Sequence, residues 1–123
     1  MWEAYNEKAV CIIKFMDIIK NNFSSISFII PCYNEEDNIS DVINEIESAI
    51  ISFSNIVYEI IIIDDASKDK TLKIIKEMQK VNKNIKIIQN KENKGLGGSI
   101  KKGFCNTQND KYRYVYILVG AHI

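Results

Sequence analysis

An unbroken run of four isoleucines, Ile60 to Ile63, limits the possible folds of this chain more than any other feature. Successive side chains of a strand point to opposite faces of a sheet, so a strand here would be apolar on both faces. Such strands are expected in parallel sheets whose two faces are both covered by helices. Similar short apolar runs alternate along the chain with segments of helical spacing. We predict strands at 26–30, 57–63, 85–89 and 114–119, and helices at 38–51, 69–81 and 98–105.

The alternation βαβαβαβ indicates a Rossmann-like, doubly wound α/β fold with parallel strands. Right-handed crossovers place the C-terminal end of every strand at one edge of the sheet. Ligands bind at that edge, near the point where the strand order reverses. We expect the order 3-2-1-4 for the four predicted strands, so that the fourth lies at the side of the sheet. An uncovered strand there would expose apolar surface and favour self-association.

Residues 1–25 precede this pattern and carry a different one. Between Ala4 and Lys20 apolar residues recur at spacings of three and four, which predicts an amphipathic helix. Its polar face carries both charge signs, which favours packing on the domain or on a partner over a membrane surface. Charged residues interrupt the apolar runs, so the segment has no signal-peptide or membrane-spanning pattern. We therefore divide the chain into this helical segment, residues 1–25, and one domain, residues 26–123.

Composition argues against several classes of function. Sixteen Lys and Arg residues balance sixteen Asp and Glu residues, so binding to nucleic acid through its phosphate backbone is disfavoured. The three cysteines are widely spaced and the chain has one histidine, which supports neither a disulfide framework nor a structural zinc site. We expect reduced thiols and a reducing, cytoplasmic compartment.

The segment that follows the first predicted strand combines turn residues with candidate ligand contacts. Pro31 is expected to end the strand because it lacks a backbone donor, and Asn34 or Asn38 can cap the next helix. Capping does not explain an aromatic residue beside a carboxylate at the ligand edge. There Tyr33 could pack on a flat ring and Glu35 could accept hydrogen bonds.

Two adjacent aspartates, Asp64 and Asp65, follow the second predicted strand. Their carboxylates repel each other and need a partner, whether a donor, a cation or water. A base N–H, a ribose hydroxyl or a metal would each serve. An Asx turn closed by the aspartates themselves is the structural alternative, and Ser67 or Asp69 can cap the following helix.

A glycine-rich turn containing Lys94, Gly95 and Gly98 follows the third predicted strand and leads into a helix. Glycines let a backbone approach phosphates closely, and a helix N-terminus presents unpaired N–H groups. The spacing matches neither the dinucleotide fingerprint nor the P-loop, so a phosphate loop and a flexible turn both remain open. After the fourth predicted strand, His122 is either a metal ligand, a proton carrier or a solvated residue.

Together these segments resemble the N-terminal half of family 2 glycosyltransferases of the GT-A fold. The resemblance spans about residues 26–119. Within the family the chain looks most like the dolichyl- or polyprenyl-phosphate sugar transferases. The resemblance rests on three motifs in order: Ile26 to Glu35, Tyr58 to Thr71 and Asn93 to Ser99.

In that family this half binds a nucleotide-diphosphate sugar, here UDP- or GDP-linked. The resemblance implies that the first motif lines the base and ribose pocket, that the acid pair lies at the base, and that the glycine turn borders the diphosphate. The acceptor would be a lipid phosphate or a glycan, which places the chain in the cytoplasm or at the cytoplasmic face of a membrane. The implied nucleotide-sugar-binding residues are Pro31, Tyr33, Glu35, Asp64, Asp65, Lys94, Gly95 and Gly98.

One part of the resemblance fails. In the family an Asp-x-Asp motif, or a variant that keeps its last aspartate, follows the fourth strand and holds Mg²⁺ or Mn²⁺. Here that place reads Gly120-Ala121-His122, and hard cations prefer oxygen ligands. Imidazole can still bind Mn²⁺, so His122 is the candidate metal ligand.

The family's general base and acceptor site would lie beyond the end of this chain. We therefore predict no catalytic residue in it and an apparently truncated transferase domain that is incomplete for catalysis alone. The alternative is a catalytically silent nucleotide-binding or interaction scaffold.

Overall fold

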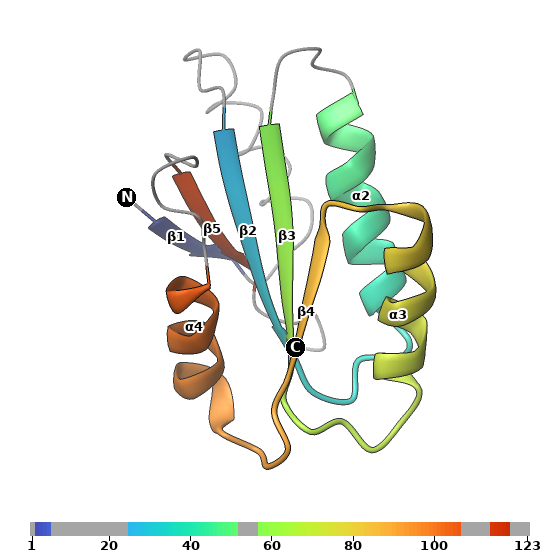
Figure 1. The fold of residues 1–123 in the computed structure, drawn as a ribbon, viewed down its shortest axis with the longest axis vertical. Coiled ribbons are helices and arrows are strands. Elements are labelled where there is room, and N and C mark those ends of the chain that lie inside the picture. The colour runs from blue at the N-terminus through green and yellow to red at the C-terminus, as the bar shows by residue number, and fades with distance from the viewer. Residues whose placement is uncertain (1, 6–24, 52–56, 107–113, 119–123) are drawn as a thin grey trace.

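The computed structural model describes residues 2–5, 25–51, 57–106 and 114–118. Five strands and three helices alternate along these residues (Figure 1). In chain order they are β1, Trp2–Tyr5; β2, Ser25–Cys32; α2, Ile39–Ile51; β3, Val57–Asp64; α3, Thr71–Val81; β4, Ile85–Gln89; α4, Gly95–Cys105; and β5, Tyr114–Leu118. None of the described helices is long and apolar enough to cross a membrane.

The described strands form one parallel sheet in the order β1-β5-β2-β3-β4. The four strands predicted from the sequence lie in the predicted order, which confirms the doubly wound arrangement. Strand β1 adds a fifth position beside β5, with Trp2 opposite Val115. The expectation that the fourth predicted strand forms the side of the sheet is therefore wrong, because β1 covers its outer edge.

The start of the chain differs from the sequence prediction. Ala4 and Tyr5, the first residues of the expected N-terminal helix, are extended in β1. The rest of that expected helix, residues 6–20, lies outside the described part of the chain. Helical spacing is a local signal, whereas β5 offers a row of backbone N–H and C=O groups to any segment that reaches it.

Helices α2 and α3 cover one face of the sheet and α4 covers the other (Figure 1). The isoleucine run divides between the two faces, as its length and position predict. Ile60 and Ile62 pack in the larger core under α2 and α3. Ile61 and Ile63 pack with Ile100 of α4 in the smaller one.

Pro31 does not end β2, contrary to the sequence expectation. The strand continues to Cys32, with Pro31 opposite Ile63. The carbonyl of Cys32 accepts the N–H of Asp65 at 2.9 Å, so the backbone groups of Cys32 face β3. The missing N–H of Pro31 then faces the other side, where the described pairing with β5 already stops at Ile29. Proline is tolerated there because it removes no bond from the ladder with β3.

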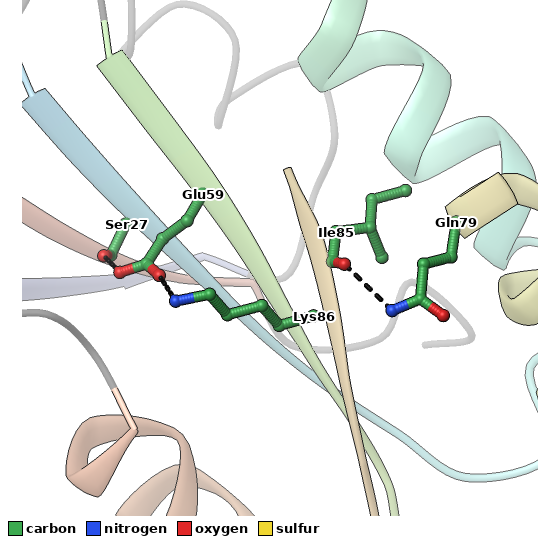
Figure 2. A network of polar contacts seen from close by, with 5 residues as sticks. All are labelled: Ser27, Glu59, Gln79, Ile85 and Lys86. Atoms are coloured by element: carbon green, nitrogen blue, oxygen red, sulfur yellow. Dashed lines mark hydrogen bonds and ion pairs between the residues drawn. The ribbon is translucent and has the colours of Figure 1, made fainter. Parts of the chain in front are cut away.

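A buried polar row crosses the sheet at the end away from the strand C-termini. Figure 2 shows Ser27 of β2 donating to the carboxylate of Glu59 in β3, and Lys86 of β4 binding the same carboxylate. Lys86 Nζ lies 2.7 Å from Glu59 Oε1. In the same view the side chain of Gln79 donates to the carbonyl of Ile85 at 3.1 Å. That contact gives a hydrogen-bond donor to a backbone carbonyl of β4, which is the edge strand of the sheet opposite β1.

Gly103 sets how closely α4 approaches the sheet. A Cβ at this position would lie 2.5 Å from Cγ2 of Ile29 and 3.0 Å from Cδ1 of Ile63. We expect Gly103→Ala to lower the free energy of unfolding by about 1–2 kcal/mol, because overpacking outweighs the helix propensity of alanine. Gly97→Ala in the same helix is the control, because a Cβ there has nothing within 4 Å. Urea denaturation measures both variants, and equal effects would show that α4 is free to shift.

Candidate functional site

The loops that follow β2, β3 and β4 meet at the C-terminal ends of the strands (Figure 1). Backbone-to-side-chain bonds join the first two loops. The N–H of Asn34 donates to Ser67 Oγ at 2.9 Å, and the N–H of Lys68 donates to Asn34 Oδ1 at 2.8 Å. One step farther along, the N–H of Glu35 donates to Thr71 Oγ1 at 2.8 Å. The two motifs recognised in the sequence are therefore one bonded unit.

Two residues of this unit have left-handed backbone conformations. Asn34 has a φ of 52° and Ala66 a φ of 64°. The left-handed region costs roughly 1–2 kcal/mol for a residue with a Cβ, although asparagine tolerates it better than alanine. Such conformations persist where the surrounding contacts fix them, and they cluster at functional sites.

The first motif divides between the surface and the interior. Tyr33 is 42% exposed, whereas Pro31 and Glu35 are buried. The carbonyl of Glu35 accepts the N–H groups of Asn38 and Ile39 and so begins α2. The side chain of Asn34, one of the two expected caps of this helix, binds the neighbouring loop instead.

Asp69 binds the first residue of α3, although the N-cap of this helix is Lys70, whose side chain makes no capping bond, and not Asp69 or Ser67. Its Oδ1 accepts the N–H of Thr71 at 2.9 Å, and its Oδ2 accepts the N–H of Glu36 at 3.3 Å. Burial acts to raise the pKa of Asp69, but the hydrogen bonds from Thr71 and Glu36 hold it below its ordinary value. The carboxylate therefore stays charged and keeps both loops in place.

Asp64 is a buried carboxyl group without a hydrogen-bond partner in the described part of the chain. It lies at the end of β3, directly opposite Cys32, and is 1% exposed. Neither of its carboxyl oxygens has a hydrogen-bond partner among the described residues. Buried polar atoms without partners are rare in native proteins and costly. Asp64 therefore points to a ligand that brings a donor.

Asp65 faces the opposite side of the sheet and is fully engaged. Its Oδ1 accepts the side-chain N–H of Asn90 at 2.9 Å and the N–H of Lys94 at 2.7 Å, and its Oδ2 accepts the N–H of Gly95 at 2.9 Å. Burial acts to raise the pKa of Asp65, but the hydrogen bonds from Lys94, Asn90 and Gly95 hold it below its ordinary value. Asp65 lies one residue past the end of β3 and continues its alternation, so the two adjacent aspartates face different sides of the sheet and do not form a joint site.

Asp65 also fixes the glycine-rich turn that leads into α4, because it accepts two backbone N–H groups of this turn. Helix α4 begins at Gly95, three residues before the predicted start, and Gly95 has a φ of 77°, which favours glycine. At Gly98 a Cβ would lie 3.0 Å from the Cβ of Lys94. The N–H groups of Lys94 and Gly95 are donated to Asp65, so they are not the unpaired donors that the sequence suggested for a phosphate.

Sequence reasoning did not assign Asn90 to the site. Asn90 is buried, donates to Asp65 and accepts from Lys102 Nζ at 3.0 Å, while its N–H donates to the carbonyl of Asp64 at 2.9 Å. It therefore links the acid pair to α4. A polar residue at the end of an apolar strand was the available signal, because parallel strands end at the same edge.

The thiol of Cys32 lies among the acidic groups of the site. Burial, followed by the charges of Asp64 and Glu35, raises the pKa of Cys32 far above its ordinary value. The thiol stays protonated at neutral pH and is a poor nucleophile. Cys32 is therefore a packing residue beside Asp64.

No group of three His, Cys, Asp or Glu side chains that could hold a metal ion is present in the described part of the chain. The two oxygens of Asp65 are already bound by N–H donors. The predicted metal ligand, His122, lies outside the described residues. The described residues do not fit a metal by themselves.

Asp65 should make the stability of the chain depend on acid pH. Its pKa is lowered on folding, so its stabilising contribution is present above the unfolded pKa and is lost as pH falls through the folded one. At neutral pH we expect Asp65→Asn to lower the free energy of unfolding by about 1.5–3 kcal/mol, the range for hydrogen bonds to a charged group. Urea denaturation between neutral pH and about pH 3 should show the difference from the unchanged chain shrinking below about pH 4. A difference that is constant with pH would contradict this role.

A comparison with known families matches this arrangement. The model of a family described as "Glycosyl transferase family 2" matches residues 27–119. The chain belongs to glycosyltransferase family 2. The match begins at the third residue of β2 and ends one residue after β5, so the family resemblance and the GT-A fold expected from the sequence are confirmed.

Individual relatives agree with the family. A dolichyl-phosphate beta-glucosyltransferase from Dictyostelium discoideum is 38% identical over 87 residues, which are 63% of this chain and 26% of that enzyme. The TarS protein of S. aureus, solved as residues 1–349 in complex with UDP-GlcNAc, has a TM-score of 0.61 at 25% identity and matches 77% of this chain and 26% of TarS. The chain spans well under half of the length of the curated relatives it matches.

A solved structure that contains a metal ion shares the fold. The mannosyltransferase PcManGT from Pyrobaculum calidifontis, solved with GDP-Man and Mn²⁺, has a TM-score of 0.56 at 14% identity over 82% of this chain and 32% of PcManGT. A divalent metal therefore occurs among proteins of this fold. For this glycosyltransferase-family chain the metal stays a prediction that depends on His122.

Proposed function

We propose that this chain binds the nucleotide part of a nucleotide-diphosphate sugar at the C-terminal edge of its sheet. The observation that carries the proposal is Asp64, which is buried beside the loops of the family motifs and has no hydrogen-bond partner among the residues that the structure describes. A nucleobase has ring or exocyclic N–H groups that can donate to such a carboxyl group. Burial makes that bond worth more than it would be in water.

The surrounding residues supply the other contacts of a nucleoside pocket. In this proposal the base packs against Tyr33, while Pro31 and Glu35 line the pocket at the end of β2. The half-exposed ring of Tyr33 suits this role, because it offers an aromatic face at the ligand edge. The Lys94 to Gly98 turn borders the diphosphate.

The sugar would then pass to a lipid phosphate or a glycan. Relatives whose names include dolichyl phosphate and a solved complex with UDP-GlcNAc support this class of donor and acceptor. In an inverting transfer a general base deprotonates the acceptor, whose oxygen attacks the sugar carbon opposite the leaving diphosphate. We assign the role of this general base to no residue of this chain. We place the proposed activity in the cytoplasm or at the cytoplasmic face of a membrane.

Calorimetric titration of residues 1–123 with UDP and GDP, with and without Mn²⁺, tests the proposal. We expect saturable binding of one of the two nucleotides. Guanine presents two adjacent N–H donors and can satisfy both oxygens of Asp64, whereas uracil presents one, so the preference between UDP and GDP reports the base contact.

Asp64→Asn and Glu92→Gln are the matched variants for this titration. Both remove one negative charge near the ligand edge, but Glu92 is exposed and Asp64 is buried. Loss of binding in Asp64→Asn alone would support the pocket. No binding of either nucleotide by the folded chain would overturn the proposal and favour a silent interaction scaffold.

A further inference from the structure

Asp65 reaches from the end of β3 to the turn after β4 and binds the start of α4. Its two oxygens accept the N–H groups of Lys94 and Gly95 at 2.7 and 2.9 Å. Counted from the residue that precedes it, here Lys94, a helix leaves its first four N–H groups without partners inside the helix. The single carboxylate of Asp65 therefore accepts the first two of these four N–H groups.

The next two N–H groups, those of Leu96 and Gly97, find no acceptor among the described residues. This end of α4 is open, since Leu96 is 50% exposed and a Cβ on Gly97 would have nothing within 4 Å. Exposed N–H groups at the start of a helix favour anions. The N–H groups of the turn that are available to an anion, those of Leu96 and Gly97, thus directly follow the two that Asp65 binds.

We propose that Asp65 is a positioning residue for the diphosphate of the donor: it holds the Lys94 to Gly98 turn so that Lys94, Leu96 and Gly97 meet the phosphates together. The inference rests on the proposed function, because it assumes a nucleotide diphosphate at this edge. The inference gives the two adjacent aspartates different roles. Asp64 binds the base, and Asp65 touches no ligand but fixes the turn that does.

The turn needs such an anchor because its own sequence is permissive. Three of the four residues from Gly95 to Gly98 are glycines, which have more backbone freedom to lose than any other residue. Gly95 has a φ of 77°, and its N–H is shared between Asp65 Oδ2 at 2.9 Å and Asn93 Oδ1 at 3.0 Å. The Asn93 contact is local to the turn, whereas Asp65 ties the turn to β3. Without the carboxylate, ligand binding would have to supply part of the ordering of the turn, and that cost appears as weaker binding.

In this proposal Asp65 favours diphosphate binding by positioning the turn, although its negative charge opposes that binding. A carboxylate close to a diphosphate repels it, so a purely electrostatic view predicts tighter diphosphate binding when the charge is removed. The positioning role predicts weaker diphosphate binding when the carboxylate is removed. The two views therefore give opposite signs for one substitution, Asp65→Asn, which keeps the side-chain shape but cannot accept both N–H bonds.

The decisive experiment compares uridine, UMP and UDP, and in parallel guanosine, GMP and GDP, by NMR titration of the chain and of Asp65→Asn. We expect nucleoside affinity to change by less than about twofold and diphosphate affinity to fall about tenfold, the equivalent of one lost hydrogen bond. Asp64→Asn should instead weaken all three ligands of the bound series by the same factor. The backbone amide signals of Leu96 and Gly97 should broaden or shift in Asp65→Asn alone.

Gly95→Ala gives an independent variant should Asp65→Asn fail to fold. It strains the positive φ of the turn without changing any charge or meeting any neighbour within 4 Å. We expect the same pattern, a loss that grows with the number of phosphates.

Unchanged or tighter UDP and GDP binding by Asp65→Asn would overturn the positioning role, and so would an equal loss for nucleoside and diphosphate. Absence of binding to the unchanged chain would instead remove the proposed function, and this inference with it.

Discussion

Asp64→Asn is expected to make the chain more stable while it abolishes most of its nucleotide binding. Asp64 is buried, and both of its carboxyl oxygens lack partners among the described residues. A neutral amide of the same shape is less costly to bury than a carboxylate, so the free energy of unfolding should rise by about 1 kcal/mol. Binding should weaken about 10- to 100-fold, because a hydrogen bond from a base to a charged acceptor is worth roughly 1.5–3 kcal/mol.

Thermal or urea denaturation and calorimetry on the same preparations measure the two effects. Glu92→Gln, on an exposed residue, should change neither by more than about 0.5 kcal/mol. Opposite signs for stability and binding are the signature of a group kept for a ligand rather than for the fold. A loss of stability in Asp64→Asn would mean that the carboxyl group has a partner within the protein and would remove the main support for the pocket.

Lys86→Met should destabilise the chain without touching the ligand edge. Lys86 binds the buried carboxylate of Glu59 at 2.7 Å, with side-chain exposures of 41% and 2% (Figure 2). Removing one partner of a fully buried ion pair costs about 3–5 kcal/mol. Because Lys86 reaches solvent and Ser27 still donates to Glu59, we expect a smaller loss of about 2 kcal/mol.

Lys80→Met on α3 is the matched control for this change. Its ion pair with Glu77 is 3.3 Å long and exposed on both sides, at 69% and 61%, so its loss should cost less than about 0.5 kcal/mol. Urea denaturation compares the two variants. Combining Lys86→Met with Glu59→Gln should recover part of the loss, since the buried charge is then gone. Equal effects of the two lysine substitutions would show that the polar row contributes no more than a surface pair.

Burial on both faces explains why the sheet could be predicted. The run Ile60–Ile63 has no polar side to turn to water, so it favours a parallel sheet that is covered on both faces. Right-handed crossovers then limit the topology, and the predicted order of four strands is confirmed. The motifs at the strand ends followed from the same rule, because parallel strands end at one edge.

What the sequence by itself determined is therefore the layered sheet, the edge at which its loops gather and the family. Only the tertiary structure decided that β1 adds a strand beside β5, that β2 continues through Pro31, and that Asp64 and Asp65 serve opposite faces. Each of these depends on a partner from elsewhere in the chain: a free strand edge, a ladder that does not need the proline donor, and the N–H groups of a distant turn. Local spacing identifies the elements, but pairing between distant segments decides which of the two carboxylates finds hydrogen-bond donors within the described part of the chain.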